Sequence, residues 1–246
     1  MKPFFAALRF LTVLPVPERW CGGEEELRRG VSFFTAVGIC IGGFAAVLDS
    51  ALGRILPPLP AAVLVVIFLA AASGGLHLDG LADTADGFFS SRTRDRILEI
   101  MRDSRTGPMG AAAVACLIAL KVAALASVPP ARRWGAILLM PVAGRCALAV
   151  MMAVLPYART DGGLCRVFLG SRPARQAAWA LILFASAAWW ASGWAGLGAT
   201  AASVAAALLL SLYGHRKIGG FTGDTLGAAC ELVEVIPALA AAVRMP

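Results

Sequence analysis

The sequence predicts an all-α fold, a polytopic membrane helix bundle of about seven transmembrane helices plus interfacial helices, in a single integral membrane domain over residues 1–246. Of these residues 59% are hydrophobic and only 15% are charged, whereas soluble domains have about 25% charged residues. Several apolar runs also approach the length of about 20 helical residues that crosses a hydrocarbon layer. Lipid is therefore the expected solvent for most of the chain.

Seven apolar segments are the candidate spans. They cover residues 31–53, 57–76, 107–128, 134–156, 174–192, 195–213 and 224–243. The fifth and sixth are joined by only residues 193–195, so they must form a tight helical hairpin if both cross. Small residues crowd the spans, as in GICIGGFAA from Gly38, which favours close helix packing.

The segment before the first span, MKPFFAALRFLTVLPVP, predicts an amphipathic helix on the membrane surface. A cleaved signal peptide is a poorer interpretation, because Arg9 and then prolines interrupt the apolar run. The six cysteines are far apart and form no C-x-x-C pair, which argues against a zinc site or a disulfide framework.

The positions of Lys and Arg predict the topology, because cytoplasmic loops carry the excess of these residues. Of the 22 Lys and Arg residues, all but six lie in the N-terminal segment or in and beside the connections at 77–106, 157–173 and 214–223. The N-terminus is therefore expected inside and the C-terminus outside, in the cytoplasmic (inner) membrane. Net charge is +7, but no basic run is interleaved with aromatics, so nucleic acid is not an expected partner and membrane lipids are.

The segment HLDGLADTADGFF, at the inner end of the second span, carries three aspartates on one helix face. Asp79, Asp83 and Asp86 stand at positions i, i+4 and i+7, within one narrow stripe. Their mutual repulsion near a membrane is costly unless a cation lies among them. Oxygen ligands favour Mg²⁺, Mn²⁺ or Ca²⁺, so a metal site is predicted. A solvated acidic helix end is the alternative.

His77 lies two residues before Asp79 and points away from the aspartate stripe on a continuous helix. A helix break at Gly74 and Gly75 could turn it toward the carboxylates. It is either a functional group or an interfacial histidine that caps the span.

The next segment, SRTRDRILEIMRDSRTGPMG, predicts an interfacial helix and then a helix start at Pro108, capped by Ser104 or Thr106. Backbone N–H groups at a helix start bind anions, and glycines let a ligand approach closely. Arg102, Arg105 and Gly107 are therefore candidate phosphate-binding residues. The arginines before them, at positions 92, 94 and 96, are better explained as anchors to anionic lipid headgroups.

Ionisable residues inside membrane spans are rare unless they pair or serve a site. Lys121 and Arg145 lie within the third and fourth spans and are candidate phosphate ligands, Arg145 being the stronger. The last span opens with Gly223 and Asp224, which we expect to join the aspartates around one or two metal ions. Glu231 and Glu234 follow on that span. In the alternative interpretation these glutamates pair with Lys121 or Arg145 as structural bonds.

Five motifs make the sequence resemble a known family along nearly its whole length. They are RFLTVLPVP from Arg9, GGLHLDGLADTADGF from Gly74, RDSRTGPMGA from Arg102, GRCALAV from Gly144 and GGFTGDTLGAACELVE from Gly219. With them the chain resembles the adenosylcobinamide-GDP ribazoletransferases, the cobalamin (5′-phosphate) synthases of the late vitamin B12 pathway.

The resemblance implies a Mg²⁺-dependent transferase of the cytoplasmic membrane, with Mn²⁺ a possible substitute and the active site facing the cytoplasm. It would join the ribose 3′-hydroxyl of α-ribazole, or of its 5′-phosphate, to adenosylcobinamide-GDP. GMP would leave, giving adenosylcobalamin or its 5′-phosphate. A homo-oligomer or other cobalamin-assembly enzymes are possible partners.

The resemblance assigns the acidic motif, hence Asp79, Asp83, Asp86 and Asp224, as metal ligands. In the mechanism that we predict, Asp79 and Asp83 hold Mg²⁺ on the pyrophosphate. Asp83 and Asp86 are the catalytic candidates, and Asp86 either binds metal or accepts the proton of the attacking hydroxyl. Arg105 and Arg145 would neutralise phosphate charge, as in other phosphoryl transfers.

Two other functions are alternatives to this one. CDP-alcohol phosphotransferases also carry aspartates on a membrane helix, but in a D-x-x-D-G pattern, whereas this chain has D-G-x-x-D-x-x-D. A cation transporter would place acidic residues near mid-membrane on broken helices, not at the inner end of a span beside arginines.

Overall fold

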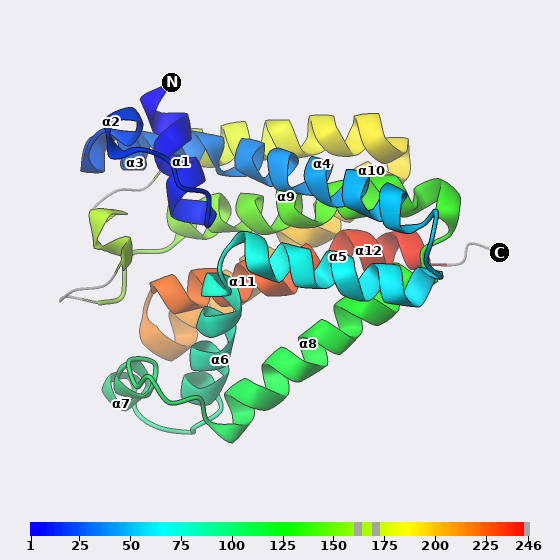
Figure 1. Ribbon diagram of the computed structural model, residues 1–246. Helices are drawn as coiled ribbons and strands as arrows, with labels where there is room; N and C mark the ends of the chain where they lie inside the picture. The colour runs from blue at the N-terminus through cyan, green and yellow to red at the C-terminus, as the bar shows by residue number, and fades with distance from the viewer. Residues whose placement is uncertain (160–163, 169–172, 244–246) are drawn as a thin grey trace.

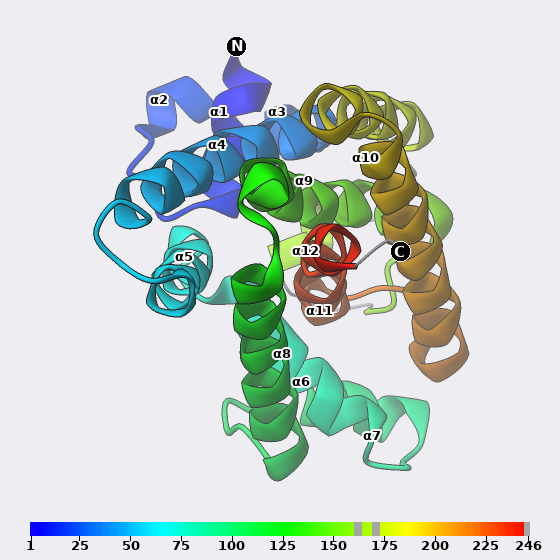
Figure 2. The ribbon, with the colours of Figure 1, turned by 90° about the vertical axis from the view of Figure 1, so that its right-hand side faces the viewer.

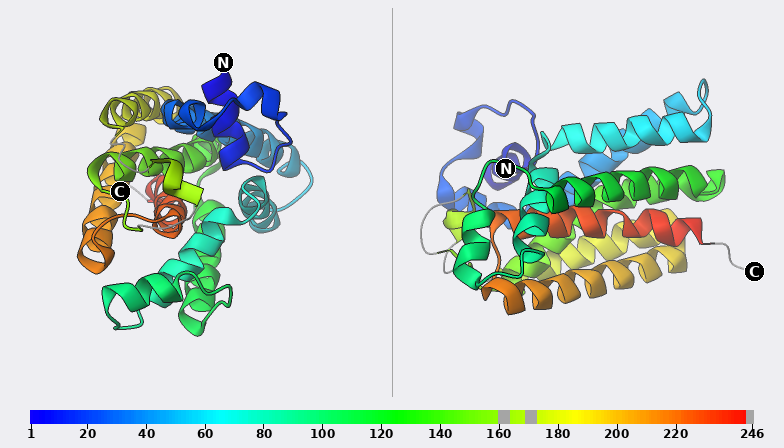
Figure 3. Two further views of the ribbon diagram at one scale, coloured as in Figure 1. Left: turned by 90° about the vertical axis from the view of Figure 1, so that its left-hand side faces the viewer. Right: turned by 90° about the horizontal axis from the view of Figure 1, so that it is seen from below.

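The computed structural model describes residues 1–159, 164–168 and 173–243, and within these ranges every regular element is a helix. Seven helices form the bundle in the described residues, and most of them run along a common direction, with α8 inclined to the others (Figures 1 and 3). They are α4 (Phe34–Leu52), α5 (Pro58–Ala72), α8 (Pro108–Ser127), α9 (Pro130–Val154), α10 (Ala174–Ile218), α11 (Gly223–Glu234) and α12 (Ile236–Ala242). The all-α membrane bundle predicted from composition is confirmed.

The remaining helices gather at one end of this bundle (Figure 1). They are α1 (Lys2–Leu11), α2 (Glu18–Cys21), α3 (Glu24–Gly30), η1 (Val31–Phe33), α6 (Leu76–Phe88), α7 (Arg94–Ile100) and η2 (Leu164–Phe168). The arginine-rich connections lie at this end, as their shared charge predicted. Of the connection at 157–173, residues 160–163 and 169–172 lie outside the described residues, as does the C-terminal end at 244–246.

Five helices of the described chain are long and apolar enough to cross a membrane, and the bent pair α5–α6 makes a sixth if it is counted as one span. α10 contains two of the predicted spans, since Gly193, at φ 56° and ψ −133°, breaks it into arms at 174–192 and 194–218. Figure 3 shows both arms running along the bundle. The tight hairpin predicted at 193–195 is therefore present, and about seven crossings agree with the fold.

The bundle is built around α9, which lies between α4, α10 and the α11–α12 pair (Figure 2). Glycines bring the neighbouring backbones against it. A Cβ on Gly38 would lie 2.7 Å from the carbonyl oxygen of Pro141, and one on Gly144 would lie 2.8 Å from that of Cys230. Close backbone approach of this kind is how helices associate where lipid removes the hydrophobic driving force.

The outer surface of the bundle is apolar. Large hydrophobic side chains such as Phe44, Val47 and Leu209 are more than half exposed. Four tryptophans gather around the α10 hairpin, Trp134 packing on Trp190 and Trp189 on Trp194. Apolar flanks with an aromatic group at one end fit contact with lipid and its headgroup boundary.

The aspartate helix does not continue the second span, which is a correction to the sequence interpretation. The span predicted at 57–76 ends as α5 at Ala72, and α6 leaves at 87° to it. Gly74 and Gly75 make this corner with φ of 62° and 75°, a region that favours glycine. α6 therefore lies across the end of the bundle rather than along it (Figure 1).

The predicted helix after the aspartates exists as α7, but its apolar face packs on protein. Ile97 and Met101 are each 2% exposed and contact Phe88 and Ile218. Arg94, predicted to bind lipid headgroups, instead donates from Nε to the carbonyl of Ile218 at 2.9 Å and from Nη2 to that of Ala158 at 2.8 Å. α7 is thus fixed to the end of α10.

The N-terminal segment forms the predicted helix, α1, which lies across the end of the bundle (Figure 1). It buries Ala7 and Leu11 against the other helices. The chain after it is tied to the end of α5, because the backbone N–H of Val13 donates to the carbonyl of Ala72 at 3.0 Å. α1 therefore stands close to the corner from which α6 begins.

Candidate active site

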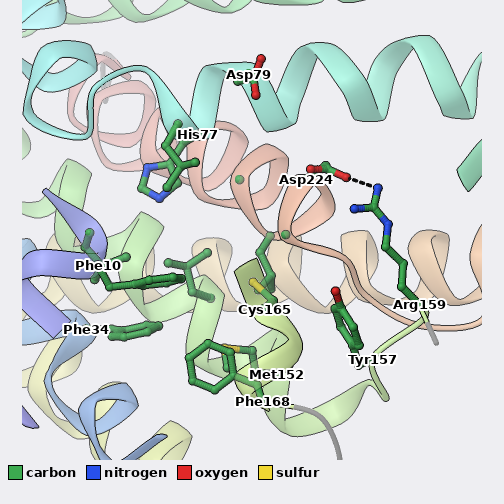
Figure 4. Close-up of a pocket in the computed structure, with 16 residues that line it drawn as sticks. Phe10, Phe34, His77, Asp79, Met152, Tyr157, Arg159, Cys165, Phe168 and Asp224 are labelled. Carbon is green, nitrogen blue, oxygen red and sulfur yellow. Dashed lines mark hydrogen bonds and ion pairs between the residues drawn. The ribbon is translucent and has the colours of Figure 1, made fainter. Parts of the chain in front are cut away.

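A cavity of about 260 Å³ opens where α6 and α11 meet, at the arginine-rich end of the bundle. One side is polar and includes Asp79, Asp224, Arg159 and Tyr157 (Figure 4). The other side is apolar and includes Phe10, Phe34, Leu148, Met152 and Phe168. The two halves suit a ligand that carries charge at one end and a flat apolar group at the other.

Glycines set the distance between α6 and α11. A Cβ on Gly80 would lie 2.8 Å from the carbonyl oxygen of Asp224, and one on Gly227 would lie 3.1 Å from that of His77. The two backbones are therefore in contact. This contact brings Asp79 and Asp83, which flank Gly80 on α6, beside Asp224 in the first turn of α11.

The start of α11 is held by a capping box. The Thr222 hydroxyl accepts from the Thr225 N–H at 3.3 Å, and the Thr222 N–H donates to the Thr225 hydroxyl at 2.8 Å. Gly223 follows and lines the cavity. A rigid first turn fixes where Asp224 presents its carboxylate.

Asp224 is paired with Arg159. Its Oδ2 accepts from Arg159 Nη2 at 2.7 Å and from the Thr222 hydroxyl at 3.2 Å. The Arg159 side chain is 10% exposed, so this ion pair is largely shielded from water. Figure 4 shows the pair on the polar side of the cavity, with Asp79 beyond it.

Asp83 is partly buried and has other carboxylates around it. Partial burial, followed by the neighbouring charges of Asp79, Asp224 and Asp86, raises the pKa of Asp83 to about 7, and Arg159 opposes this only in part. A raised pKa means that the negative form is disfavoured by its surroundings. A cation between these side chains would reverse that penalty.

The carboxylates at this site have the oxygen atoms that a hard divalent cation prefers, but in this structure they are not arranged as its ligands. Asp79, Asp83 and Asp224 offer oxygen atoms only, which Mg²⁺ and Mn²⁺ prefer. Among the described residues, however, no three Asp, Glu, His or Cys side chains stand in a ready ligand arrangement. The Asp224 carboxylate is turned to Arg159 instead.

Asp86, the fourth predicted ligand, is engaged elsewhere. Its Oδ2 accepts from the Gly107 N–H at 2.6 Å and its Oδ1 from the Gly110 N–H at 2.8 Å. The helix start predicted to bind phosphate is thus occupied in this structure by a carboxylate of the protein, and the assignment of Gly107 to phosphate stays a prediction. Ser104 or Thr106 was the expected cap of α8. Instead Asp86, on α6, supplies a carboxylate that accepts the N–H groups at the start of α8.

We expect Gly110→Ala to destabilise the protein by about 1–3 kcal/mol, because overpacking two helices costs this much. The added Cβ would lie 2.5 Å from Asp86 Oδ2 and 2.8 Å from the carbonyl oxygen of Ala82. Thermal unfolding in detergent measures the effect. Gly43→Ala is the control, since nothing lies within 4 Å of its Cβ. Equal melting temperatures for the two variants would contradict the close contact between α6 and α8.

The two arginines before α8, Arg102 and Arg105, were predicted to bind phosphate, but neither lines the main cavity. Arg105 is 86% exposed at its side chain and pairs with Asp103 at 2.7 Å, a contact within its own loop. Arg102 lines a second, smaller hollow with Arg94, Glu99 and Arg159, next to the main cavity. Arg105 is thus outside the described site, and Arg102 lies at its edge.

Lys121 and Arg145 form a buried ion cluster with Glu231 and Glu234. Lys121 Nζ donates to Glu231 at 2.5 Å and to Glu234 at 2.8 Å, and Arg145 pairs with Glu234. All four residues are at most 4% exposed. These contacts match the alternative interpretation, in which the glutamates pair with Lys121 or Arg145 as structural bonds. The glutamates neutralise both cations within the bundle, and the assignment of Lys121 and Arg145 as phosphate ligands stays a prediction.

Glu234→Gln is expected to destabilise the protein by about 3–5 kcal/mol, because it leaves a buried cation without a counter-charge. Thermal unfolding in detergent measures this. Glu99→Gln is a control that breaks an exposed pair, with Arg96, and should leave the melting temperature unchanged. A Glu234→Gln protein as stable as this control would show that the cluster does not hold α8, α9 and α11 together.

His77 lies between the cavity and this ion cluster. It is 4% exposed and lines the cavity, and its Nδ1 has no hydrogen-bond partner among the described residues. Figure 4 shows its ring on the side of Phe10 rather than of Asp79. The predicted separation of His77 from the aspartate stripe is therefore present.

Comparison with known proteins places the whole chain in one family. Residues 3–242 match the family model described as cobalamin-5-phosphate synthase. The chain belongs to the cobalamin-5-phosphate synthase family. This match covers all five motifs on which the resemblance was based.

Curated relatives agree with this family. The chain is 41% identical to the adenosylcobinamide-GDP ribazoletransferase of Escherichia coli O17:K52:H18, over 97% of this chain and 98% of that protein. It is 38% identical to the protein of that name from Acetivibrio thermocellus, over 94% of each, and 36% identical to that from Geotalea daltonii, over 96% and 95%. No solved structure matches the chain.

Arg159 is a residue of this site that the sequence analysis did not single out. It was counted only as one of many arginines in the cytoplasmic connections. It forms the ion pair with Asp224 and lines both the main cavity and the adjoining hollow. No local motif marks it, since its partner is 65 residues away along the chain.

Proposed function

We propose that the chain is a ribazoletransferase that joins α-ribazole, or α-ribazole 5′-phosphate, to adenosylcobinamide-GDP and releases GMP. The observation that carries the proposal is the meeting of Asp79, Asp83 and Asp224 with Arg159 at one end of a membrane bundle. Carboxylates that can hold a divalent ion, beside an arginine, are the groups that phosphoryl transfer needs. The printed name of the relatives, adenosylcobinamide-GDP ribazoletransferase, supports this choice of substrates.

The reaction is a displacement at phosphorus. The ribose 3′-hydroxyl of the acceptor forms a new P–O bond to the cobinamide-side phosphate, the P–O bond to the GMP side breaks so that GMP leaves, and the hydroxyl proton passes to a carboxylate of the site or to water. Catalysis of this kind depends mainly on positioning and on neutralising the charge of the phosphates. Arg159, as a guanidinium, can hold two phosphate oxygens at once.

We further propose that Mg²⁺, which Mn²⁺ can replace, is held by Asp79, Asp83 and Asp224. When bound, the ion supplies positive charge to the pyrophosphate. Asp224 would turn from Arg159 toward the ion, and Arg159 would then be free to contact a phosphate. Asp86 would act as a positioning residue that fixes α6 to the start of α8, because both its oxygens already accept N–H groups.

We place the protein in the cytoplasmic membrane, with the cavity facing the cytoplasm. The support is the excess of Lys and Arg at the end of the bundle that contains the cavity. The substrates, a nucleoside and a nucleotide-linked corrinoid, are polar and would reach the site from water. The apolar flank of the bundle would contact lipid.

The test is an assay of purified protein in detergent with Mg²⁺, adenosylcobinamide-GDP and α-ribazole 5′-phosphate, followed for GMP. We expect GMP release that requires both substrates and stops when Mg²⁺ is chelated. Parallel reactions with a CDP-linked lipid donor test the CDP-alcohol alternative. CMP release from that donor, without GMP release from the corrinoid donor, would overturn the proposal.

A further inference from the structure

We infer that the apolar half of the cavity binds the flat aromatic base of the nucleoside acceptor, and that Nδ1 of His77 forms a hydrogen bond with that nucleoside. The inference rests on the proposed function and deepens it, since it assigns the acceptor subsite. It identifies Phe10, Phe34, Phe168 and His77 as the residues that select the acceptor.

The first support is the unpartnered nitrogen of His77. The side chain is 4% exposed, lines the cavity, and has an Nδ1 that finds no partner in the described parts of the chain. A buried polar atom without a hydrogen bond is costly, and most such atoms in native proteins are satisfied. Nδ1 itself is covered by protein, so a ligand in the cavity would satisfy it once the imidazole, which lines the cavity, turns toward that ligand.

The second support is the arrangement of the aromatic rings. The rings of Phe10 and Phe34 stack at 6.0 Å between centroids, with 16° between their planes. Phe168 meets Phe10 edge-on at 6.0 Å and Phe34 at 6.5 Å. Rings in these arrangements form an apolar wall, and such a wall suits a planar base through stacking and edge contacts.

The size of the cavity decides which substrate enters it. Its volume of about 260 Å³ is slightly below the range of about 300–1,000 Å³ typical of small-molecule sites. A corrinoid is far larger than this space, whereas a nucleoside is a small molecule. The nucleoside acceptor is therefore the occupant, and the bulk of the corrinoid donor stays outside.

The polar half then receives the sugar. With the base against Phe10 and Phe34, the ribose lies toward Asp79, Asp224 and Arg159 (Figure 4). The reactive hydroxyl of the acceptor is on the ribose, so this orientation brings the reacting groups together at the carboxylates. The geometry lowers the entropy cost of the reaction by fixing the acceptor before attack.

The inference also accounts for the N-terminal motif RFLTVLPVP, which the proposed phosphate chemistry does not use. Phe10, within this motif, supplies one wall of the cavity. The following turn is held in place by the contact of Val13 with Ala72, close to the corner before α6. The N-terminal helix is thus a part of the acceptor site.

The experiment measures the binding of α-ribazole to purified protein by titration calorimetry, without donor and without Mg²⁺. We expect His77→Phe, which keeps an aromatic ring but loses Nδ1, to weaken binding about tenfold. His77→Asn, whose amide can replace the Nδ1 hydrogen bond, should recover part of this loss. His215→Phe, at the other, exposed histidine, is the matched control and should bind as the wild type does.

Phe10→Leu is the second variant, because Phe10 is only partly buried and tolerates change better than the fully buried Phe34. It should also weaken α-ribazole binding several-fold. In the GMP assay both His77→Phe and Phe10→Leu should raise the KM for α-ribazole and leave the KM for adenosylcobinamide-GDP unchanged. Melting temperatures identify any variant that fails to fold.

Failure of this inference and failure of the proposed function give different results. If the wild-type protein releases GMP but His77→Phe and Phe10→Leu bind α-ribazole as tightly as it does, this inference is overturned and the proposed function stands. An equal rise in both KM values would also overturn it, since that result indicates general damage. If the wild-type protein neither binds α-ribazole nor releases GMP, the proposed function itself fails.

Discussion

Asp83→Asn is expected to lower the rate of GMP release about 10²- to 10³-fold at saturating substrate, a loss typical of removing one charge-stabilising group from an active site. The substitution keeps the shape of the side chain and removes a negative charge from the group formed with Asp79 and Asp224. Because crowding already disfavours the Asp83 carboxylate, the melting temperature should not fall.

The matched control for this variant is Asp95→Asn. Asp95 is on α7, its side chain is 87% exposed, and its ion pair is with the adjacent Arg94. The control should release GMP at the wild-type rate. Full activity of Asp83→Asn in Mg²⁺ would show that the carboxylates on α6 do not take part in the reaction.

Arg159→Gln is the second change with a large expected effect, a fall of about 10²-fold in kcat/KM for adenosylcobinamide-GDP. Arg159 is the arginine that pairs with Asp224 and lines both hollows, so its loss removes the positive charge closest to the expected phosphates. The KM for α-ribazole should change much less. Initial rates over a matrix of both substrate concentrations separate the two.

Arg96→Gln serves as the control for a lost positive charge at the same end of the bundle. Arg96 is 63% exposed at its side chain and pairs with Glu99 in its own helix. If the two variants lose activity equally, the effect of Arg159 is one of overall charge and not of position.

Apolar length and charge distribution were enough to predict the bundle. The spans at 107–128 and 134–156 correspond to α8 and α9 within a few residues. The hairpin at 193–195 was predictable because so short a connection permits nothing else. These features depend on local composition, and lipid as the solvent leaves few alternatives to helices.

The corner before α6 was harder to predict. Two adjacent glycines allow a sharp turn but do not require one, so a straight continuation of the second span was equally compatible with the sequence. What decides the turn is packing on distant residues. α6 is held in place by contacts of Gly80 with Asp224 and of Asp86 with Gly107 and Gly110.

The site was predictable in its residue types and only partly in its partners. The sequence identified Asp79, Asp83 and Asp224, and the structure brings these three together. It could not tell which cations pair with glutamates inside the bundle and which pairs with Asp224 at the cavity, because these partners are distant along the chain. Only the packing of α8, α9 and α11 decides that Lys121 and Arg145 are neutralised within the bundle.

The most direct test of this account is the uptake of Mn²⁺ by the purified protein, measured by electron paramagnetic resonance of the free ion. We expect the wild-type protein to bind Mn²⁺ in competition with Mg²⁺, and the Asp79→Asn/Asp83→Asn double variant to lose this binding while it stays folded. Equal uptake by the two proteins, or GMP release by a wild-type protein that binds no divalent ion, would contradict the account.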